Sequence, residues 1–335
     1  MSLIQKVKRS ASFIAENASD VSINNDSLID LAEILHQSFL SGHITPGAWK
    51  EHSLHPSSPV ASELVDWIFV LDCLNFSFWN DDFHPFSVFY QGKNHIGYWG
   101  LCAALKRALD EGIPITTPEY YQNIDELTLH HVFRQSDPTI PVPLLQERVH
   151  ILRESGRTLM NKFSGSFLNV LSKCKGSAVS LVDLIVDNFP SFCDFSSFKG
   201  RRVYFLKRAQ ILTADIHCAF EGQEPANFHD VDQLTMFADY RVPQILASIG
   251  VLKYSEQLST LLGANSLLPH GSTFEVEIRG CAIHAVEKAR ELIPENDRDK
   301  ITSVLIDFFL WDLAKQSSET SESRALTHRT RTIFY

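Results

Sequence analysis

The most distinctive pattern of apolar and polar positions lies between His229 and Gly250, in the sequence HDVDQLTMFADYRVPQILASIG. Apolar residues recur at helical spacing on both sides of Pro243, as Val231, Leu234 and Phe237 before it and as Ile245, Leu246 and Ile249 after it. This pattern predicts two helices that meet at a corner, with Pro243 in the first turn of the second helix and Gly250 at its end. Asp239, Tyr240 and Arg241 then lie at the corner.

The rest of the chain also has mainly helical patterning. Apolar spacing predicts further helices over residues 27–40, 59–71, 101–110, 144–163, 167–173 and 301–314. Ser87–Tyr90 and His95–Trp99, joined by four residues, predict one small β-hairpin. Glu275–Arg279 alternates like a strand but is also compatible with the acidic start of a helix. We therefore expect a mainly α fold, with residues 1–335 forming a single compact unit that carries a small hairpin.

Composition limits the classes of function. The chain has 30 Lys and Arg against 40 Asp and Glu, a formal net charge of −10, which argues against tight binding to a nucleic acid backbone. Its six cysteines form no CxxC pair, so we expect free thiols in a reducing, cytoplasmic compartment. No apolar run reaches the roughly 20 residues of a membrane helix. No glycine-rich phosphate loop is present either, so a phosphate must be held by other groups.

Two charged features have ordinary explanations. Lys199, Arg201 and Arg202 precede Lys207 and Arg208, with the β-like run Val203–Leu206 between them. A charge run of this kind is usually a solvated face, and Asp215 is a possible ion-pair partner on the same helix. At the corner, Asp239 is expected near a helix C-terminus, where the dipole and nearby aromatic rings oppose its charge, and an ion pair with Arg241 would explain it without a function.

Aromatic residues and histidines gather between residues 52 and 79. The cluster that ends in Trp79 is most simply part of the core, and its alternative role is a stacking wall for a flat base, with Trp79 as first choice. His52 and His55 have the spacing of a metal pair. No third ligand lies near them in the sequence, so we favour a capping or solvent role and expect no metal.

Longer blocks of the sequence resemble the queuosine salvage proteins, the queuosine 5′-phosphate N-glycosylases. The blocks occur in family order: HPSSPVASELVDWIFVLDCLNFSFWN (55–80), GYWGLCAALKRALDEGIPIT (97–116), KRAQIL (207–212), FADYRVPQ (237–244), EVEIRG (275–280) and DFFLWD (307–312). The resemblance covers nearly the whole chain. It implies a fold like that of the helical DNA glycosylases and hydrolysis of queuosine 5′-phosphate, which releases queuine for salvage into tRNA modification.

The resemblance also implies roles for individual residues. The aspartate of FADYRVPQ, which is Asp239, is the catalytic carboxylate. Lys207 and Arg208 are candidates for the 5′-phosphate, and His52 is a candidate substrate contact. The full set of expected substrate-binding residues is His52, Trp79, Lys207, Arg208, Phe237, Tyr240, Arg241, Asp307, Phe308 and Asp312. No cofactor is expected, and the expected partner is a small nucleotide bound by a monomer without direct contact to nucleic acid or membrane.

The last predicted helix carries two of these acids. Leu305, Phe308 and Asp312 share a face, so Asp312 is the favoured inward carboxylate, while Asp307 can reach in from the side. A buried carboxylate needs a basic partner. The secondary ammonium of queuine is one candidate, and an internal base such as Arg279 is the other. The polar tail 316–330 is expected to be mobile, with the closing TRTIFY docked.

Alternatives stay open at this point. Asp239 either captures the ribose as a nucleophile or stabilises the oxocarbenium charge electrostatically. Queuine has carbon at ring position 7, so its departure must be helped at another edge of the base. A non-catalytic carrier of queuine or its nucleotide would keep the aromatic walls and Asp307 or Asp312 but would not need Asp239. A glycosylase of polynucleotides is disfavoured by the net charge.

Overall fold

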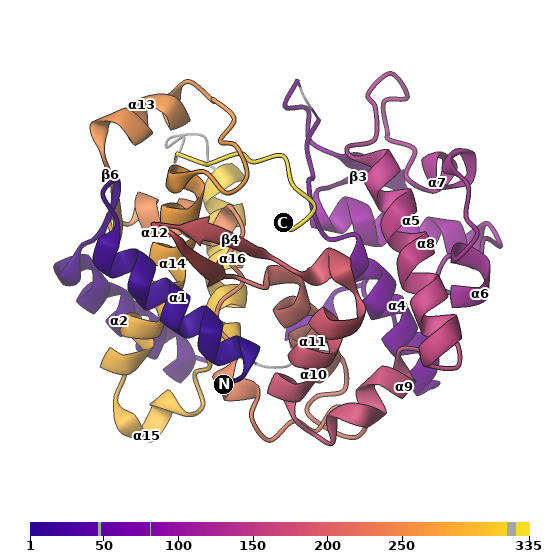
Figure 1. The fold of residues 1–335 in the computed structure, drawn as a ribbon, viewed down its shortest axis with the longest axis horizontal. Helices are drawn as coiled ribbons and strands as arrows, with labels where there is room; N and C mark the ends of the chain where they lie inside the picture. Colours follow the sequence, from indigo (N-terminus) through magenta and orange to yellow (C-terminus); the bar gives the residue numbers. More distant parts are fainter. Residues whose placement is uncertain (46–47, 81, 320–325) are drawn as a thin grey trace. The chain divides into compact units, whose positions relative to one another are not determined.

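The computed structural model describes residues 1–45, 48–80, 82–319 and 326–335. Helices account for most of these residues, and strands form only two-stranded antiparallel sheets (Figure 1). The mainly α prediction is therefore confirmed. Contacts divide the chain into two compact units, each assembled from several segments. The first unit contains residues 1–46, 194–210 and 229–332, and the second contains residues 47–193, 211–228 and 333–335.

The first unit is built around α14. Its elements are α1 (Leu3–Asn17), β1 (Val21–Ile23), α2 (Asn25–Leu40), β4 (Phe195–Phe198), β5 (Arg201–Tyr204), the start of α11 (Lys207–Ala219), η3 (Val231–Gln233), α12 (Arg241–Ser248), β6 (Leu252–Tyr254), α13 (Glu256–Gly263), α14 (Thr273–Leu292), α15 (Glu295–Arg298) and α16 (Ser303–Glu319). Helices α1, α2, α12 and α16 all contact α14. Most of α14 is buried, including its charged residues Glu275, Glu277 and Arg279.

Helix α1 packs closely along α14 (Figure 1). Ile4, Val7, Ala11 and Ile14 form its buried face at helical spacing, and the Ser2 hydroxyl caps it by accepting the Gln5 N–H at 3.3 Å. Gly280 permits the approach, because a Cβ atom there would lie 2.5 Å from Cδ1 of Ile14. Close helix packing in this unit therefore depends on one glycine.

Two small sheets join the elements of the first unit. Strand β1 pairs with β6, with Val21 opposite Tyr254, which connects segments more than two hundred residues apart in the sequence. Strands β4 and β5 form a hairpin in which Phe195 lies opposite Tyr204. This hairpin leads directly into α11 and so places Lys207.

The second unit surrounds α4 and α5. Its elements are α3 (Ala48–Glu51), α4 (Ala61–Cys73), β2 (Ser87–Tyr90), β3 (Lys93–Ile96), α5 (Tyr98–Asp110), α6 (Pro118–Tyr121), α7 (Glu126–Val132), α8 (Leu145–Lys162), α9 (Leu168–Leu171), η1 (Ser172–Cys174), α10 (Ala178–Asn188), η2 (Pro190–Phe192) and the remainder of α11. Buried Arg148 of α8 donates to the carbonyls of Leu74, Phe76 and Ser77 at 2.7, 2.6 and 3.1 Å. It thereby satisfies the backbone of the non-helical segment that follows α4.

Several local predictions are wrong in detail. Helix α2 begins at Asn25, two residues before the predicted start, and Asn24 caps it, whereas α4 begins at Ala61, two residues after the predicted start, and has no side-chain cap. The β2–β3 hairpin turns at Gln91 and Gly92 alone, a two-residue connection in which both residues have positive φ. Residues 275–279 are helical, so the strand alternative for them is wrong.

The C-terminal segment packs against the protein. Residues 320–325 of the tail that we expected to be mobile lie outside the described residues. His328 and Thr330 are buried, and the Arg329 carbonyl accepts the Leu268 N–H at 2.8 Å, which differs from the expectation of mobility. Tyr335 is also buried, and its carbonyl accepts the Ser77 N–H at 3.0 Å, so the predicted docking of the chain end is confirmed. No helix among the described residues is both long and apolar enough to cross a membrane.

Candidate functional site

Residues 234–239 form a non-helical segment whose backbone is held by three buried side chains. The bonds join Gln210 Oε1 to the Thr235 N–H (2.9 Å), Asp307 Oδ1 to the Phe237 N–H (2.8 Å) and Arg279 Nε to the Ala238 carbonyl (2.8 Å). All five residues from Leu234 to Ala238 are buried, which no amphipathic helix would allow. The predicted helix before the corner is therefore wrong, since only Val231–Gln233 forms a short 3₁₀ turn. Tertiary hydrogen bonds take the place of helical ones.

Asp239 lies two residues before the first residue of α12, next to the N-cap residue Tyr240. Its Oδ1 accepts the Arg241 N–H at 2.6 Å, and the carboxylate is partly exposed. Because the positive end of the helix dipole lies there, this position favours a negative charge. The expectation that Asp239 lies at a helix C-terminus is wrong, and so is the dipole argument built on it. Pro243 does lie in the first turn of α12, and Gly250 follows its end with φ +78°.

Asp307 of α16 lies beside this segment and is 5% exposed. Burial raises the pKa of its carboxyl well above the usual value, and the negative charge of Asp239 adds to the rise. The Phe237 N–H and the positive charge of Lys207 act in the opposite direction. Asp239 and Lys207 are therefore both close enough to Asp307 to influence its charge, although the three residues come from different segments.

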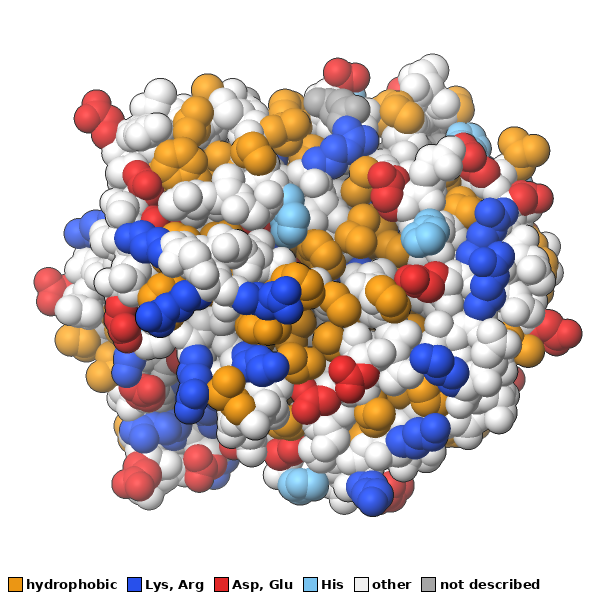
Figure 2. Space-filling model, in the orientation of Figure 1, with side chains coloured by type: hydrophobic (Ala, Val, Ile, Leu, Met, Phe, Trp, Pro, Cys, Tyr) orange, Lys and Arg blue, Asp and Glu red, His pale blue; other side chains and the backbone are white. Residues whose placement is uncertain are grey.

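The basic run divides into an exposed part and a buried part. Lys199, Arg201 and Arg202 are exposed, and their charged ends lie over the rings of Phe198, Phe13 and Phe195, respectively. Figure 2 shows Lys and Arg side chains gathered over α1 and the β4–β5 hairpin on this face. Lys207 and Arg208 are 3% and 1% exposed. The solvated-face interpretation thus holds for the first three residues and is wrong for Lys207 and Arg208.

The two segments that carry Asp239 and Asp307 also carry aromatic residues. Phe237 is buried, and its ring meets that of half-buried Phe308 edge to face, with centroids 6.0 Å apart. The Arg241 guanidinium lies 5.2 Å from the Tyr240 ring centre and donates to Gln244 Oε1 at 3.2 Å. Arg241 thus contacts Asp239 through its backbone N–H, and the expected side-chain ion pair between them is not among the salt bridges of the described residues.

Asp312 lies on the other side of α16 from Asp307. Asp307 shares the buried face with Ile306, Leu310 and Ala314, whereas Asp312 is exposed. The preference for Asp312 as the inward carboxylate is therefore wrong, and Asp307 takes that place. Arg279 is not the partner of either acid, because its ion pairs are with Asp194 and Glu275.

His52 and Trp79 belong to the second unit. The His52 ring stacks on Trp99 with centroids 3.4 Å apart, and its Nδ1 accepts the Leu54 N–H at 3.2 Å. The ring of buried His55 stacks on the Trp49 ring. Its Nδ1 is hydrogen-bonded to the Trp49 carbonyl, and its Nε2 lies 2.9 Å from the Tyr98 hydroxyl. Trp79 is half-buried and contacts Phe83. No cluster of three or more His, Cys, Asp or Glu suited to a metal occurs in the described part of the chain.

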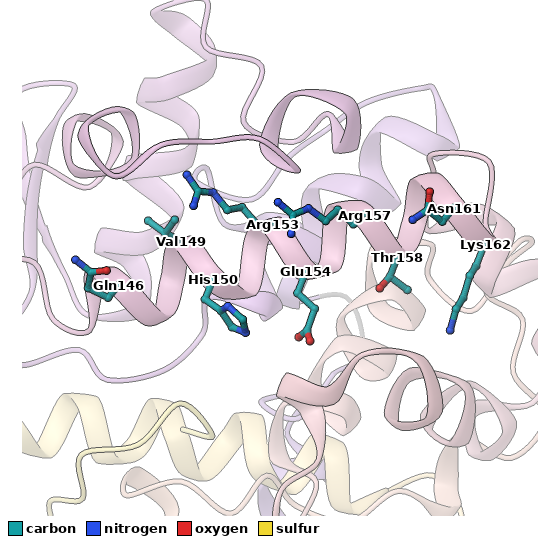
Figure 3. Close-up of a pocket in the computed structure, with 9 residues that line it drawn as sticks. All are labelled: Gln146, Val149, His150, Arg153, Glu154, Arg157, Thr158, Asn161 and Lys162. Atoms are coloured by element: carbon teal, nitrogen blue, oxygen red, sulfur yellow. The ribbon is translucent and has the colours of Figure 1, made fainter.

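A cavity of about 550 Å³ runs along α8 in the second unit. In Figure 3, His150 and Glu154 point to one side of the helix, and Arg153 and Arg157 point to the other. Arg153 donates to the Ile124 carbonyl at 2.6 Å, which gives it a structural role. The lining contains none of the residues that the sequence singles out, so this cavity does not define the candidate site.

Comparison with known proteins decides the family. Relatives named queuosine 5′-phosphate N-glycosylase/hydrolase include those of Bos taurus, 44% identical over 98% of both chains, and Nematostella vectensis, 43% identical over 98% of both chains. The Schizosaccharomyces pombe relative is 42% identical over 99% of this chain and all of its own. The sequence model of the family, described as queuosine salvage protein, matches residues 54–335. The chain belongs to the queuosine salvage protein family. The predicted family is confirmed, and with it membership of an enzyme family.

Sequence reasoning missed the buried residues whose side chains hold the backbone of the candidate site in place. The sequence analysis does not single out Asp194, includes Gln210 only as a member of the KRAQIL block, and names Arg279 only as a possible partner of a buried carboxylate. All three are buried polar side chains that bond backbone groups. The polar character of these three side chains was the available signal, because buried polar groups need partners.

Proposed function

We propose that this protein hydrolyses the N-glycosidic bond of queuosine 5′-phosphate and releases queuine for salvage into tRNA modification. Three relatives at 42–44% identity over almost the entire chain are named for this activity. The observation that carries the proposal is Asp239, held through Oδ1 at the start of α12 beside buried Asp307. The carrier alternative is not favoured, because the relatives are named as hydrolases.

The proposed reaction uses water and no cofactor. Breaking the bond between the base and C1′ of the ribose develops positive charge on the sugar, and the Asp239 carboxylate supplies the negative charge that stabilises it. Water adds its oxygen to C1′, and its two protons are shared between the new sugar hydroxyl and the departing base. The products are ribose 5-phosphate and queuine. A charge fixed in place before the reaction stabilises the transition state without reorganising.

We propose that Lys207 and Arg208 receive the 5′-phosphate. Both are buried, and charge-assisted bonds to phosphate are strong in such surroundings. The Phe237 and Phe308 rings flank the base, and Asp307 meets its ammonium. Tyr240 and Arg241 complete the proposed substrate-binding set within the first unit, and His52 and Trp79 stay candidate substrate contacts of the second unit.

The remaining proposals concern the domain organisation, the oligomeric state and the cellular compartment of the protein. Each compact unit combines segments that are interleaved along the sequence, so residues 1–335 are proposed to work as one domain. We propose that it resembles the helical DNA glycosylases in fold but acts as a monomer on a free nucleotide, without direct contact to nucleic acid. Its six free cysteines, five of them buried, suit a reducing cytoplasm.

The test is to incubate the purified protein separately with queuosine 5′-phosphate, queuosine and queuosine-containing tRNA and to measure free queuine. Release from the 5′-phosphate, weaker release from the nucleoside and none from tRNA are expected. Release of queuine from intact tRNA would contradict the choice of a free nucleotide.

A further inference from the structure

Arg279 of α14 lies at the centre of a buried ionic cluster. Its side chain is 0% exposed and stacks over the Phe205 ring, 4.0 Å from the ring centre. The guanidinium donates to both Asp194 oxygens, at 3.0 and 2.6 Å, to Glu275 Oε1 at 3.2 Å and to the Ala238 carbonyl at 2.8 Å. One side chain thus joins α14 to Asp194 and to the Ala238 carbonyl, two groups that are distant from it and from each other in the sequence.

Two of these contacts lead to the candidate site. The Ala238 carbonyl belongs to the peptide that joins Ala238 to Asp239, so Arg279 fixes the backbone immediately before the candidate catalytic carboxylate. Asp194, which is 1% exposed, uses Oδ2 also to accept the Lys207 N–H at 3.1 Å. It thereby binds the first residue of α11, which is the candidate phosphate-binding lysine.

Folding stability alone does not explain why this cluster of buried charges is present. Burial by itself would raise the pKa of Glu275, but the charges of Arg279 and His270 outweigh this effect and lower it to about 2. Buried ion pairs pay a large desolvation cost, and well-packed apolar side chains often stabilise a fold equally well. What apolar side chains cannot provide is a rigid planar donor that bonds a carboxylate and a carbonyl simultaneously.

We propose that Arg279 is a positioning residue for the glycosidic cleavage. It sets Asp239 through the Ala238 carbonyl and Lys207 through Asp194, so that the carboxylate at C1′ and the amine at the 5′-phosphate keep a fixed relation. This inference rests on the proposed function and extends it to residues that do not contact the substrate. Holding the reacting groups in the correct relative positions can raise the reaction rate by several orders of magnitude, and small displacements of these groups lower it strongly.

The test uses Arg279→Lys, which keeps the charge but cannot bond both Asp194 and the Ala238 carbonyl in the same geometry. We expect kcat for queuosine 5′-phosphate to fall at least tenfold, and the preference for the 5′-phosphate over the nucleoside to shrink, at temperatures where the variant is folded. Arg290→Lys is the matched control, because Arg290 lies on the same helix and donates to the carbonyls of Ile301 and Arg298. In Arg290→Lys, kcat and the preference for the 5′-phosphate should both stay within twofold of the wild-type values.

Asp194→Asn is the second variant and carries the test if Arg279→Lys does not fold. It keeps the size of the side chain and an acceptor for the Lys207 N–H, but weakens the bond to Arg279. We expect it to reduce the 5′-phosphate preference, and its effect should not add to that of Arg279→Lys in the double variant.

If Arg279→Lys and Asp194→Asn lower only the melting temperature and leave kcat and the substrate preference unchanged, the inference is overturned. The two ideas fail differently. A wild-type protein that releases no queuine refutes the proposed function, whereas an active wild type with equally active Arg279→Lys and Asp194→Asn variants refutes only the positioning role.

Discussion

The two carboxylate oxygens of Asp239 have different surroundings. Oδ1 accepts the Arg241 N–H, while Oδ2 has no hydrogen-bond partner among the residues that the structure describes. One oxygen therefore fixes the orientation of the group, and the other is the one that we propose faces the sugar. An amide at this position would keep the bonded acceptor and lose the charge.

We expect Asp239→Asn to lower turnover of queuosine 5′-phosphate roughly a thousandfold, which corresponds to about 4 kcal/mol of transition-state stabilisation. Substrate binding should persist, as measured by calorimetry. Asp232→Asn, an exposed aspartate of the preceding 3₁₀ turn, serves as the control and should leave turnover unchanged. Near-normal hydrolysis by Asp239→Asn would remove this residue from the mechanism.

Lys207 differs from the exposed residues of the basic run because its side chain is buried and its charge acts on Asp307. Lys207→Ala should reduce kcat/KM for the 5′-phosphate at least tenfold more than for the nucleoside, since only the first offers a dianion to bind. The matched variant is Lys199→Ala, which removes an exposed lysine of the same run. Equal losses on both substrates would assign Lys207 a structural role instead.

Asp307 and Asp312 of helix α16 differ in exposure, and of these two only Asp307 faces the candidate site. Asp307→Asn keeps an oxygen for the Phe237 N–H but removes the group that can hold a cation. It should weaken binding of queuine more than binding of 7-deazaguanine, because only queuine carries the ammonium and the diol. Affinities for both bases, compared with those of Asp312→Asn, provide the measurement. An unchanged ratio together with a lower melting temperature would show that Asp307 serves the fold alone.

The same helix shows why the sequence could not choose between these acids. Residues 303–307 are all buried, so the first turn of α16 has no polar face from which an angle can be counted. The corner was partly predictable, because Pro243 and Gly250 act through local backbone geometry. The segment before it was not, because its conformation depends on bonds from Gln210, Arg279 and Asp307, which come from three other helices.

For the site, the sequence pointed to residues that we propose contact the substrate rather than to the residues that position them. Asp239, Phe237 and Lys207 stood out because their blocks resemble those of a known family. Asp194 and Arg279 are 85 residues apart in the sequence, and nothing in the local pattern around either residue indicates that the two form an ion pair. Such pairings follow from tertiary packing, which local periodicity does not contain.

Two buried histidines make the stability of the whole chain sensitive to acid. Burial lowers the pKa of His55 and of His328 to about 4 in the folded protein, whereas an imidazole in the unfolded chain has a pKa near 6.5. Between these values the unfolded state binds more protons, so stability falls as the pH is lowered from about 6.5 to about 4. Each histidine contributes on the order of 3 kcal/mol to this loss.

We therefore expect the melting temperature to drop between pH 7 and pH 5, and to drop less in His55→Gln even though that variant starts from a lower stability. His43→Gln, which changes an exposed histidine, should reproduce the wild-type slope. If His55→Gln shows the full wild-type decrease, His55 takes up its proton equally in the folded and unfolded chains, and the account of its burial is wrong.

The most direct test of the central claim is the release of queuine from queuosine 5′-phosphate by the wild-type protein, followed by chromatography with mass detection. Stoichiometric formation of queuine and ribose 5-phosphate, with many turnovers per protein molecule and no added cofactor, is the predicted result. Binding of the nucleotide without appearance of either product would contradict the claim and would favour a carrier.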